Sequence, residues 1–161
     1  MEISIVLVIL GLIAGGVLSG QALIHAAEIR GIVTDYSRFT TASNSFRDKY
    51  FAMPGDMSNA TQFWRFAGTT ASPNCVSNSG ITTISTPGTC DGNGDGILAY
   101  PAAANATGEA FQGWKHLALA ELIEGIYTGN AGTVGIADPD LGSNSPASKI
   151  RSVGWGYGYV D

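Results

Sequence analysis

The sequence predicts an α+β protein in which a long N-terminal α-helix leads into a small, loop-rich head. Three observations predict this fold class. Residues 3–27 contain no Asp, Glu, Lys or Arg, an amphipathic pattern continues directly from them, and the rest of the chain is rich in Gly, Ser, Thr and Asn. We therefore expect an apolar helix segment at 1–27, its amphipathic continuation at 28–53 and a globular head at 54–161.

The apolar segment is long enough to cross a membrane. Roughly twenty apolar residues span a bilayer core as a helix, and the charge-free run from Ile3 to Ala27 meets that length. The run exceeds the apolar part of a cleaved signal peptide, and no Lys or Arg precedes it. We expect it to be a transmembrane helix rather than a removed signal.

Four glycines interrupt the apolar segment: Gly11, Gly15, Gly16 and Gly20. Small residues at such spacings let apolar helices approach closely. Each glycine also weakens the helix by up to about 1 kcal/mol relative to alanine. The pattern predicts that this stretch packs closely against other helices and unwinds first when its environment changes.

The helical pattern continues past the apolar segment. Apolar residues recur mainly at three- and four-residue steps, with charged residues largely off that stripe, as in an amphipathic helix packed on a domain. We expect one continuous helix that ends just before Pro54, because proline disfavours helix at the residue before it. The predicted stripe comprises Ala22, Ala26, Ile29, Val33, Tyr36, Phe39, Phe46 and Tyr50.

The opening residues, MEISIVLVILGLIAGG, resemble the start of mature type IV pilins and type II secretion pseudopilins. The resemblance implies that Glu2 neutralises the N-terminal amine of a neighbouring subunit during assembly. A carboxylate in an apolar helix bundle is costly unless it is paired; the alternative role is a favourable interaction with the helix dipole. Members of this family begin with an aromatic residue shortly before the glutamate, so we expect a few residues to precede Met1 in the mature chain.

Two cysteines in the head predict a disulfide. Cys75 and Cys90 enclose fourteen turn-rich residues, and in a secreted protein such a pair closes a loop worth about 3 kcal/mol. The alternative is two unrelated buried thiols.

The low charged fraction of 13% and the abundance of small polar residues suit an extracellular surface.

The head is expected to contain two helices and a short antiparallel sheet. Asp56 or Ser58 is expected to cap a short helix that extends through Phe66. A second helix is predicted over residues 107–127, with Gly129 ending it. Strands are predicted at 81–84 and where Val153, Trp155, Tyr157 and Tyr159 alternate with glycine. Because the chain stops within this last pattern, we expect an edge strand or further sequence.

The segment Asp91-Gly-Asn-Gly-Asp-Gly96 matches the first half of a calcium-binding loop. The predicted ligands are the side chains of Asp91, Asn93 and Asp95 and the backbone carbonyl of Ile97. Ala102 stands at the twelfth position of the loop, where an EF-hand has its glutamate, so a complete EF-hand is excluded. Glu109 is a candidate ligand from the following helix, and the alternative is a turn that needs no metal.

Other functional classes have little support in the sequence. The net charge of −5 with only eight Lys and Arg argues against a nucleic-acid-binding groove. His25 and His116 have no metal-ligand spacing and are expected to be packing or surface residues. We find no nucleophile motif or phosphate-binding loop and expect a protein that is not an enzyme.

We expect a subunit of an extracellular type IV pilus-like filament, held in the inner membrane before the pilus assembly machinery polymerises it with its own copies. One alternative is a minor pseudopilin of a type II secretion system. Another is a membrane-anchored calcium-binding or adhesive domain that never polymerises. Glu2 favours the first two, because an ordinary anchor gains nothing from a carboxylate there and usually carries flanking Lys or Arg.

Overall fold

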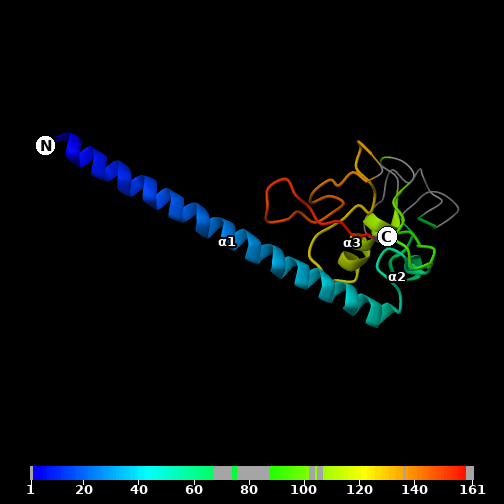
Figure 1. Ribbon diagram of the computed structural model, residues 1–161. Coiled ribbons are helices and arrows are strands. Elements are labelled where there is room, and N and C mark those ends of the chain that lie inside the picture. Colours follow the sequence, from blue (N-terminus) through cyan, green and yellow to red (C-terminus); the bar gives the residue numbers. More distant parts are fainter. Residues whose placement is uncertain are drawn as a thin grey trace. The chain divides into compact units, whose positions relative to one another are not determined.

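The computed structural model describes residues 2–66, 74–75, 88–101, 104, 107–135 and 137–158. Within these residues there are three α-helices: α1 at Glu2–Tyr50, α2 at Ala60–Trp64 and α3 at Glu109–Leu119 (Figure 1). The chain divides into two compact units, Met1–Ser37 and Arg38–Asp161. The predicted long helix and small head are therefore confirmed, and the second unit includes the last part of α1.

Helix α1 is continuous over 49 residues, as the pattern predicted. It ends at Tyr50, before Pro54 is reached, because Phe51 adopts a left-handed backbone with φ of 54°. The Phe51 N–H still donates to the Arg47 carbonyl at 2.8 Å, which closes the last turn. The glycine-rich stretch from Gly11 to Gly20 is helical throughout.

The N-terminal unit has exposed apolar side chains. Ile3, Leu12 and Leu23 are each more than 70% exposed, at 79%, 76% and 72%. An α-helical segment of this length and hydropathy is able to cross a membrane, and no side chain of its most apolar window is buried. The unit on its own therefore leaves its apolar surface uncovered.

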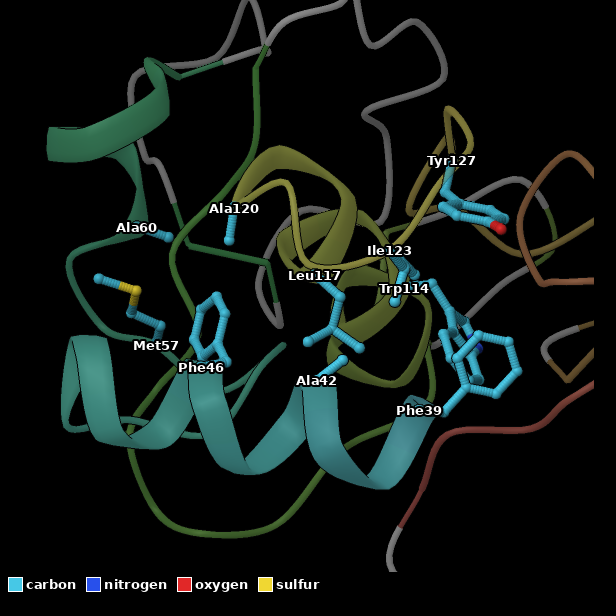
Figure 2. Close-up of a cluster of buried hydrophobic side chains, with 10 residues drawn as sticks. All are labelled: Phe39, Ala42, Phe46, Met57, Ala60, Trp114, Leu117, Ala120, Ile123 and Tyr127. Carbon is cyan, nitrogen blue, oxygen red and sulfur yellow. The ribbon is translucent and has the colours of Figure 1, made fainter. Parts of the chain in front are cut away.

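The second unit is built around a core that the last part of α1 shares with α3. Figure 2 shows Phe39, Ala42 and Phe46 projecting from α1 toward Trp114 and Leu117 of α3. All five side chains are at most 6% exposed. The predicted stripe is confirmed at Phe39 and Phe46, and Ala42 fills the gap that the sequence pattern left between them. Its earlier members Ile29, Val33 and Tyr36 are more than 60% exposed, so the prediction that they pack on the domain is wrong.

Aromatic rings contribute much of this core. Phe39 meets Trp114 edge to face with ring centroids 4.9 Å apart, and it meets Trp155 edge to face with ring centroids 5.4 Å apart. Phe46 packs on Tyr50 at 4.6 Å and lies parallel to His116 at 6.1 Å. Edge-to-face pairs of this kind add to the free energy gained from burial alone.

Helix α2 differs from its prediction at both ends. It ends at Trp64 rather than extending through Phe66, and Asn59, not Asp56 or Ser58, occupies the N-cap position. The Asn59 side chain makes no capping hydrogen bond. The cap comes instead from Asp91, whose Oδ1 accepts from the Thr61 N–H at 2.7 Å.

Helix α3 ends well before the predicted Tyr127. The Glu121 and Leu122 N–H groups donate to the Ala118 and Leu117 carbonyls at 3.0 Å each, which is a Schellman ending. This ending requires a left-handed residue after the C-cap, and Glu121 takes that position with φ of 60°. Glycine normally occupies this left-handed position. Because no glycine stands here, the sequence pattern predicted a helix that continues too far.

The predicted antiparallel sheet is not found among the described residues, which contain only isolated bridges. Ala147 pairs with Gly154, and the Trp155 N–H donates to the Pro146 carbonyl at 2.9 Å. The pairing stops there and forms no β-strand among the described residues. Trp155 and Tyr157 nevertheless both pack on the core, as their alternation predicted; the predicted strand at 81–84 and Tyr159 lie outside the described residues.

Candidate functional site

The first candidate site is the apolar part of α1. Glu2 is its first helical residue, followed by the charge-free run to Ala27. An added Cβ at Gly11, Gly15, Gly16 or Gly20 would meet no atom within 4 Å. Nothing described in this chain therefore requires glycine at these four positions, and any close packing they permit involves another molecule.

The second candidate site is the loop after the disulfide. Cys75 and Cys90 form the predicted disulfide, with Cα atoms 5.2 Å apart and both residues buried. The Cys75 N–H donates to the Asp91 carbonyl at 2.7 Å, and the Thr107 hydroxyl donates to the Cys75 carbonyl at 3.1 Å. The disulfide thus fixes the start of the loop from Asp91 to Gly96.

Asp91, the first predicted metal ligand, is directed toward α2. Its Oδ1 accepts from the Thr61 N–H, and its Oδ2 accepts from the Thr61 hydroxyl at 3.0 Å. A carboxylate at a helix N-terminus satisfies free N–H groups and is favoured by the helix dipole. The structure therefore gives Asp91 a capping role.

Asn93 and Asp95 form local turns and are both exposed. Asn93 Oδ1 accepts from the Asp95 N–H at 2.9 Å, and Asp95 Oδ1 accepts from the Ile97 N–H at 2.8 Å. Asn93 Nδ2 donates to Asp95 Oδ2 at 2.8 Å. These bonds fold the loop, and Asp95 joins a group of carboxylates.

That group consists of Asp56, Asp95 and Glu109, each with a carboxylate oxygen within 4.8 Å of the others. Asp56 accepts from the Gly94 N–H at 2.6 Å and from the Gly96 N–H at 2.8 Å. Glu109 accepts from the Asn93 N–H at 2.9 Å and the Ala99 N–H at 3.0 Å. Two buried carboxylates thus hold the loop by its backbone.

The sequence predicts Asp95 and Glu109 as ligand candidates, but it predicts Asp56 or Ser58 as a helix cap. The partners of Asp56 lie 38 and 40 residues away along the chain. No local pattern marks this role, because a polar residue that follows Pro54-Gly55 at the end of a helix is ordinarily exposed. Asp56 is instead only 5% exposed.

The environment of Glu109 raises its pKa above the usual value. Burial is the largest cause; the N–H groups of Ala99 and Asn93 oppose it, and the charges of Asp56 and Asp95 add to it. A raised pKa means that the folded protein binds this proton more tightly than the unfolded chain. Without a cation, stability contributed by Glu109 therefore declines as pH rises from 4.5 through the raised pKa.

The chemistry of the acidic group suits a hard cation. Ca²⁺ takes six to eight oxygen ligands, and three carboxylates supply anionic oxygens that would otherwise repel one another. Their N–H partners leave further lone pairs on the same oxygens. Asp56, Asp95 and Glu109 are thus the described residues best placed to hold such an ion.

A buried polar network supports this loop from α3. The Gly55 N–H donates to His116 Nδ1 at 2.9 Å, so the ring proton lies on Nε2, which is 2.7 Å from the Thr89 hydroxyl. Thr89 in turn donates to Gln112 Oε1 at 2.9 Å, and Gln112 Nε2 donates to the Gly129 carbonyl at 3.2 Å. His116 is therefore a buried residue with polar partners at both ring nitrogens; His25 lies on the exposed surface beside Glu28.

Two basic groups are buried on α3 next to this network. Burial, followed by the Lys115 charge, lowers the pKa of His116 to about 3, although the Cys90 backbone opposes the shift. Burial alone lowers the pKa of Lys115 to about 7. Its Nζ donates to the Thr128 carbonyl at 3.2 Å. Neither group forms an ion pair among the described residues; at neutral pH His116 is uncharged, whereas Lys115 titrates in that range.

No protein-family model, curated protein or solved structure matches this chain. The functional interpretation therefore rests on the residues and their geometry.

Proposed function

We propose that this chain is a structural, non-catalytic subunit of an extracellular type IV pilus-like filament. The observation that carries the proposal is the apolar part of α1, whose most apolar window has no buried side chain although it is continuous with a helix that packs in a core. Exposed apolar surface of this extent requires a membrane or other helices to cover it. In a subunit that leaves the inner membrane and joins a homopolymer, this surface would be covered first by the membrane and then by the helices of other copies.

Glu2 supports assembly over simple anchoring. It stands at the first turn of a segment with no other charge before Glu28. In an apolar bundle its carboxylate needs a positive partner, and the N-terminal amine of an adjacent copy supplies one. The four unobstructed glycines allow neighbouring helices to approach closely enough for that pairing.

We further propose that the acidic group binds Ca²⁺ and thereby fixes the head surface. Asp95 lies on the exposed loop, whereas Asp56 and Glu109 are buried, so an ion held by all three would connect the loop to the core. This role is independent of the N-terminal helix. It would hold equally for a filament subunit and for an anchored domain.

The test is electron microscopy of sheared surface fractions from the native source, with mass spectrometry to identify the subunit. We expect filaments made of this chain. Glu2→Ala should abolish them while the chain stays in the membrane fraction, and the matched variant Glu28→Ala should leave them intact. If the unaltered chain remained wholly in the membrane, the filament proposal would be rejected in favour of a minor pseudopilin or an anchored domain.

A further inference from the structure

Two adjoining cavities lie in the second unit, and neither is lined by the acidic group. The first, of about 230 Å³, has no charged residue in its lining. The second, of about 410 Å³, is polar and includes Asp138 and Asp140. Pro139 lines both cavities, so they adjoin at this residue.

The first cavity is lined mainly by aromatic rings. Of these rings, Trp114 is buried at 2% exposed, whereas Tyr100 is 48% exposed. Tyr157 reaches the cavity because Gly113 lets it approach α3; a Cβ there would lie 2.6 Å from the Tyr157 ring. The rings that line this cavity belong to Tyr100, Phe111, Trp114, Trp155 and Tyr157.

Ser145 supplies a polar group that lacks a partner. The residue is 2% exposed, and its Oγ makes no hydrogen bond in the part of the chain that the structure describes. It lies 3.3 Å from the position of a Cβ on Gly154, and both residues line the aromatic cavity. Since an unpaired buried hydroxyl is unfavourable, a ligand that hydrogen bonds to it would gain free energy on binding.

The second cavity presents oxygen atoms that are held in place. Asn144 donates to the Asp138 carbonyl at 3.0 Å and accepts from the Asp140 N–H at 2.7 Å. Asp138 Oδ2 accepts from the Val134 N–H at 3.0 Å. These bonds fix the loop that carries both carboxylates, which are strong acceptors for hydroxyl groups.

We propose that the two cavities bind a neutral carbohydrate of at least two sugar rings. One ring would lie in the aromatic cavity, where its C–H groups meet the negative faces of the aromatic rings and a hydroxyl pairs with Ser145. The next ring would extend past Pro139 and donate hydroxyl hydrogen bonds to Asp138 and Asp140. The two carboxylates disfavour an anionic ligand, and a purely apolar ligand would leave the polar cavity unused. This inference does not depend on filament assembly, because every lining residue lies in the second unit.

The test is a fluorescence titration of the full chain in a zwitterionic detergent, since maltoside or glucoside detergents would compete for the site. The probes are maltose, cellobiose, lactose and N,N′-diacetylchitobiose. Two of the three tryptophans line the aromatic cavity, so binding should change the emission in a saturable way. We expect at least one of these disaccharides to bind.

Two variants locate the binding. Gly156 lines the aromatic cavity and an added Cβ there meets no atom within 4 Å, so Gly156→Leu should narrow the site without disturbing the fold and weaken binding about tenfold or more. Gly135→Leu is the matched control, since Gly135 is equally unobstructed and lines neither cavity. The affinity of the Gly135→Leu variant for the disaccharide should be unchanged.

Ser145→Ala separates a binding role from a structural one. Removing an unpaired buried hydroxyl should leave the melting temperature unchanged or higher, while affinity for the same disaccharide falls several-fold. The proposal is overturned if no disaccharide binds to folded protein, or if Gly156→Leu and Gly135→Leu bind equally well. It is also overturned if the cavities bind a proline- or tyrosine-containing peptide and no sugar.

Discussion

The two parts of helix α1 differ in how far their apolar side chains are buried. Between Ile3 and Ile24 its large apolar side chains are at least 52% exposed, whereas Phe39, Ala42 and Phe46 are at most 6% exposed. The later part is stabilised by a core within its own chain. The earlier part has no comparable partner among the described residues, so its environment must supply one, and changes in the two parts should have separable consequences.

The largest expected effect comes from removing the central ring of the core. Phe46 is fully buried against Tyr50, Trp64 and His116. Phe46→Ala should lower the free energy of unfolding of the head by about 3–5 kcal/mol, measured by denaturant titration with near-ultraviolet circular dichroism. Phe51→Ala, at a ring that is 93% exposed, is the matched control and should change it by less than about 0.5 kcal/mol. Equal losses in the two variants would contradict the assignment of the core.

Reduction of the disulfide should have the next largest effect. The Cys75–Cys90 bond closes a loop with a sequence separation of 15. Its loss should lower the free energy of unfolding by about 3 kcal/mol, measured by guanidinium titration with and without reductant. Membrane fractionation should be unaffected, because the apolar part of α1 lies outside the loop. If reduction changed the membrane fractionation but not the stability of the head, the two parts of α1 would not be separable in this way.

Calcium should stabilise the head by a similar or smaller amount. At a concentration one hundred times the dissociation constant, a bound ligand adds about 2.7 kcal/mol to the free energy of unfolding. We expect Ca²⁺ to raise the melting temperature and Asp95→Asn to remove the rise, while Asp48→Asn, at an exposed carboxylate outside the acidic group, keeps it. Because Glu109 must lose its proton to bind the ion, the rise should diminish at acidic pH. A rise that survives in Asp95→Asn would place the ion elsewhere.

The last expected effect is a pH dependence caused by Lys115, which is small for each single pH unit. Its pKa is about 7 in the folded protein and 10.5 in the unfolded chain, so the unfolded state binds more protons between these values. Stability should therefore rise with pH across that interval, with a slope of at most about 1.4 kcal/mol per pH unit. Lys115→Met should flatten this rise and stabilise the head below pH 7, as followed by thermal melts across the range. An unchanged slope in the variant would assign the effect to another group.

The sequence predicted the features that depend on local pattern. The charge-free run, the stripe containing Phe39 and Phe46, and the only two cysteines were sufficient for α1 and the disulfide. The end of α3 was not predictable in the same way, because Glu121 adopts a left-handed conformation without the usual glycine. The expected edge strand failed because, among the described residues, pairing does not extend beyond the Ala147–Gly154 bridge.

The candidate acidic site was predicted only in part, because its partners are distant in sequence. Asp95 and Glu109 could be identified from the loop motif and the following helix. Asp91 resembled a metal ligand but caps α2, 30 residues earlier in the chain. Asp56 resembled a cap but binds the loop backbone. A carboxylate has the same local signature in either role, and only the tertiary fold decides between them.

We propose that the apolar part of α1 finds its partners in other copies of the chain. The most direct measurement places a photo-crosslinking amino acid at Leu12, which is 76% exposed, and irradiates intact cells and sheared surface fractions. We expect a ladder of covalent multimers of this chain in the surface fraction. Crosslinks to lipid alone, with the chain monomeric in every fraction, would contradict it.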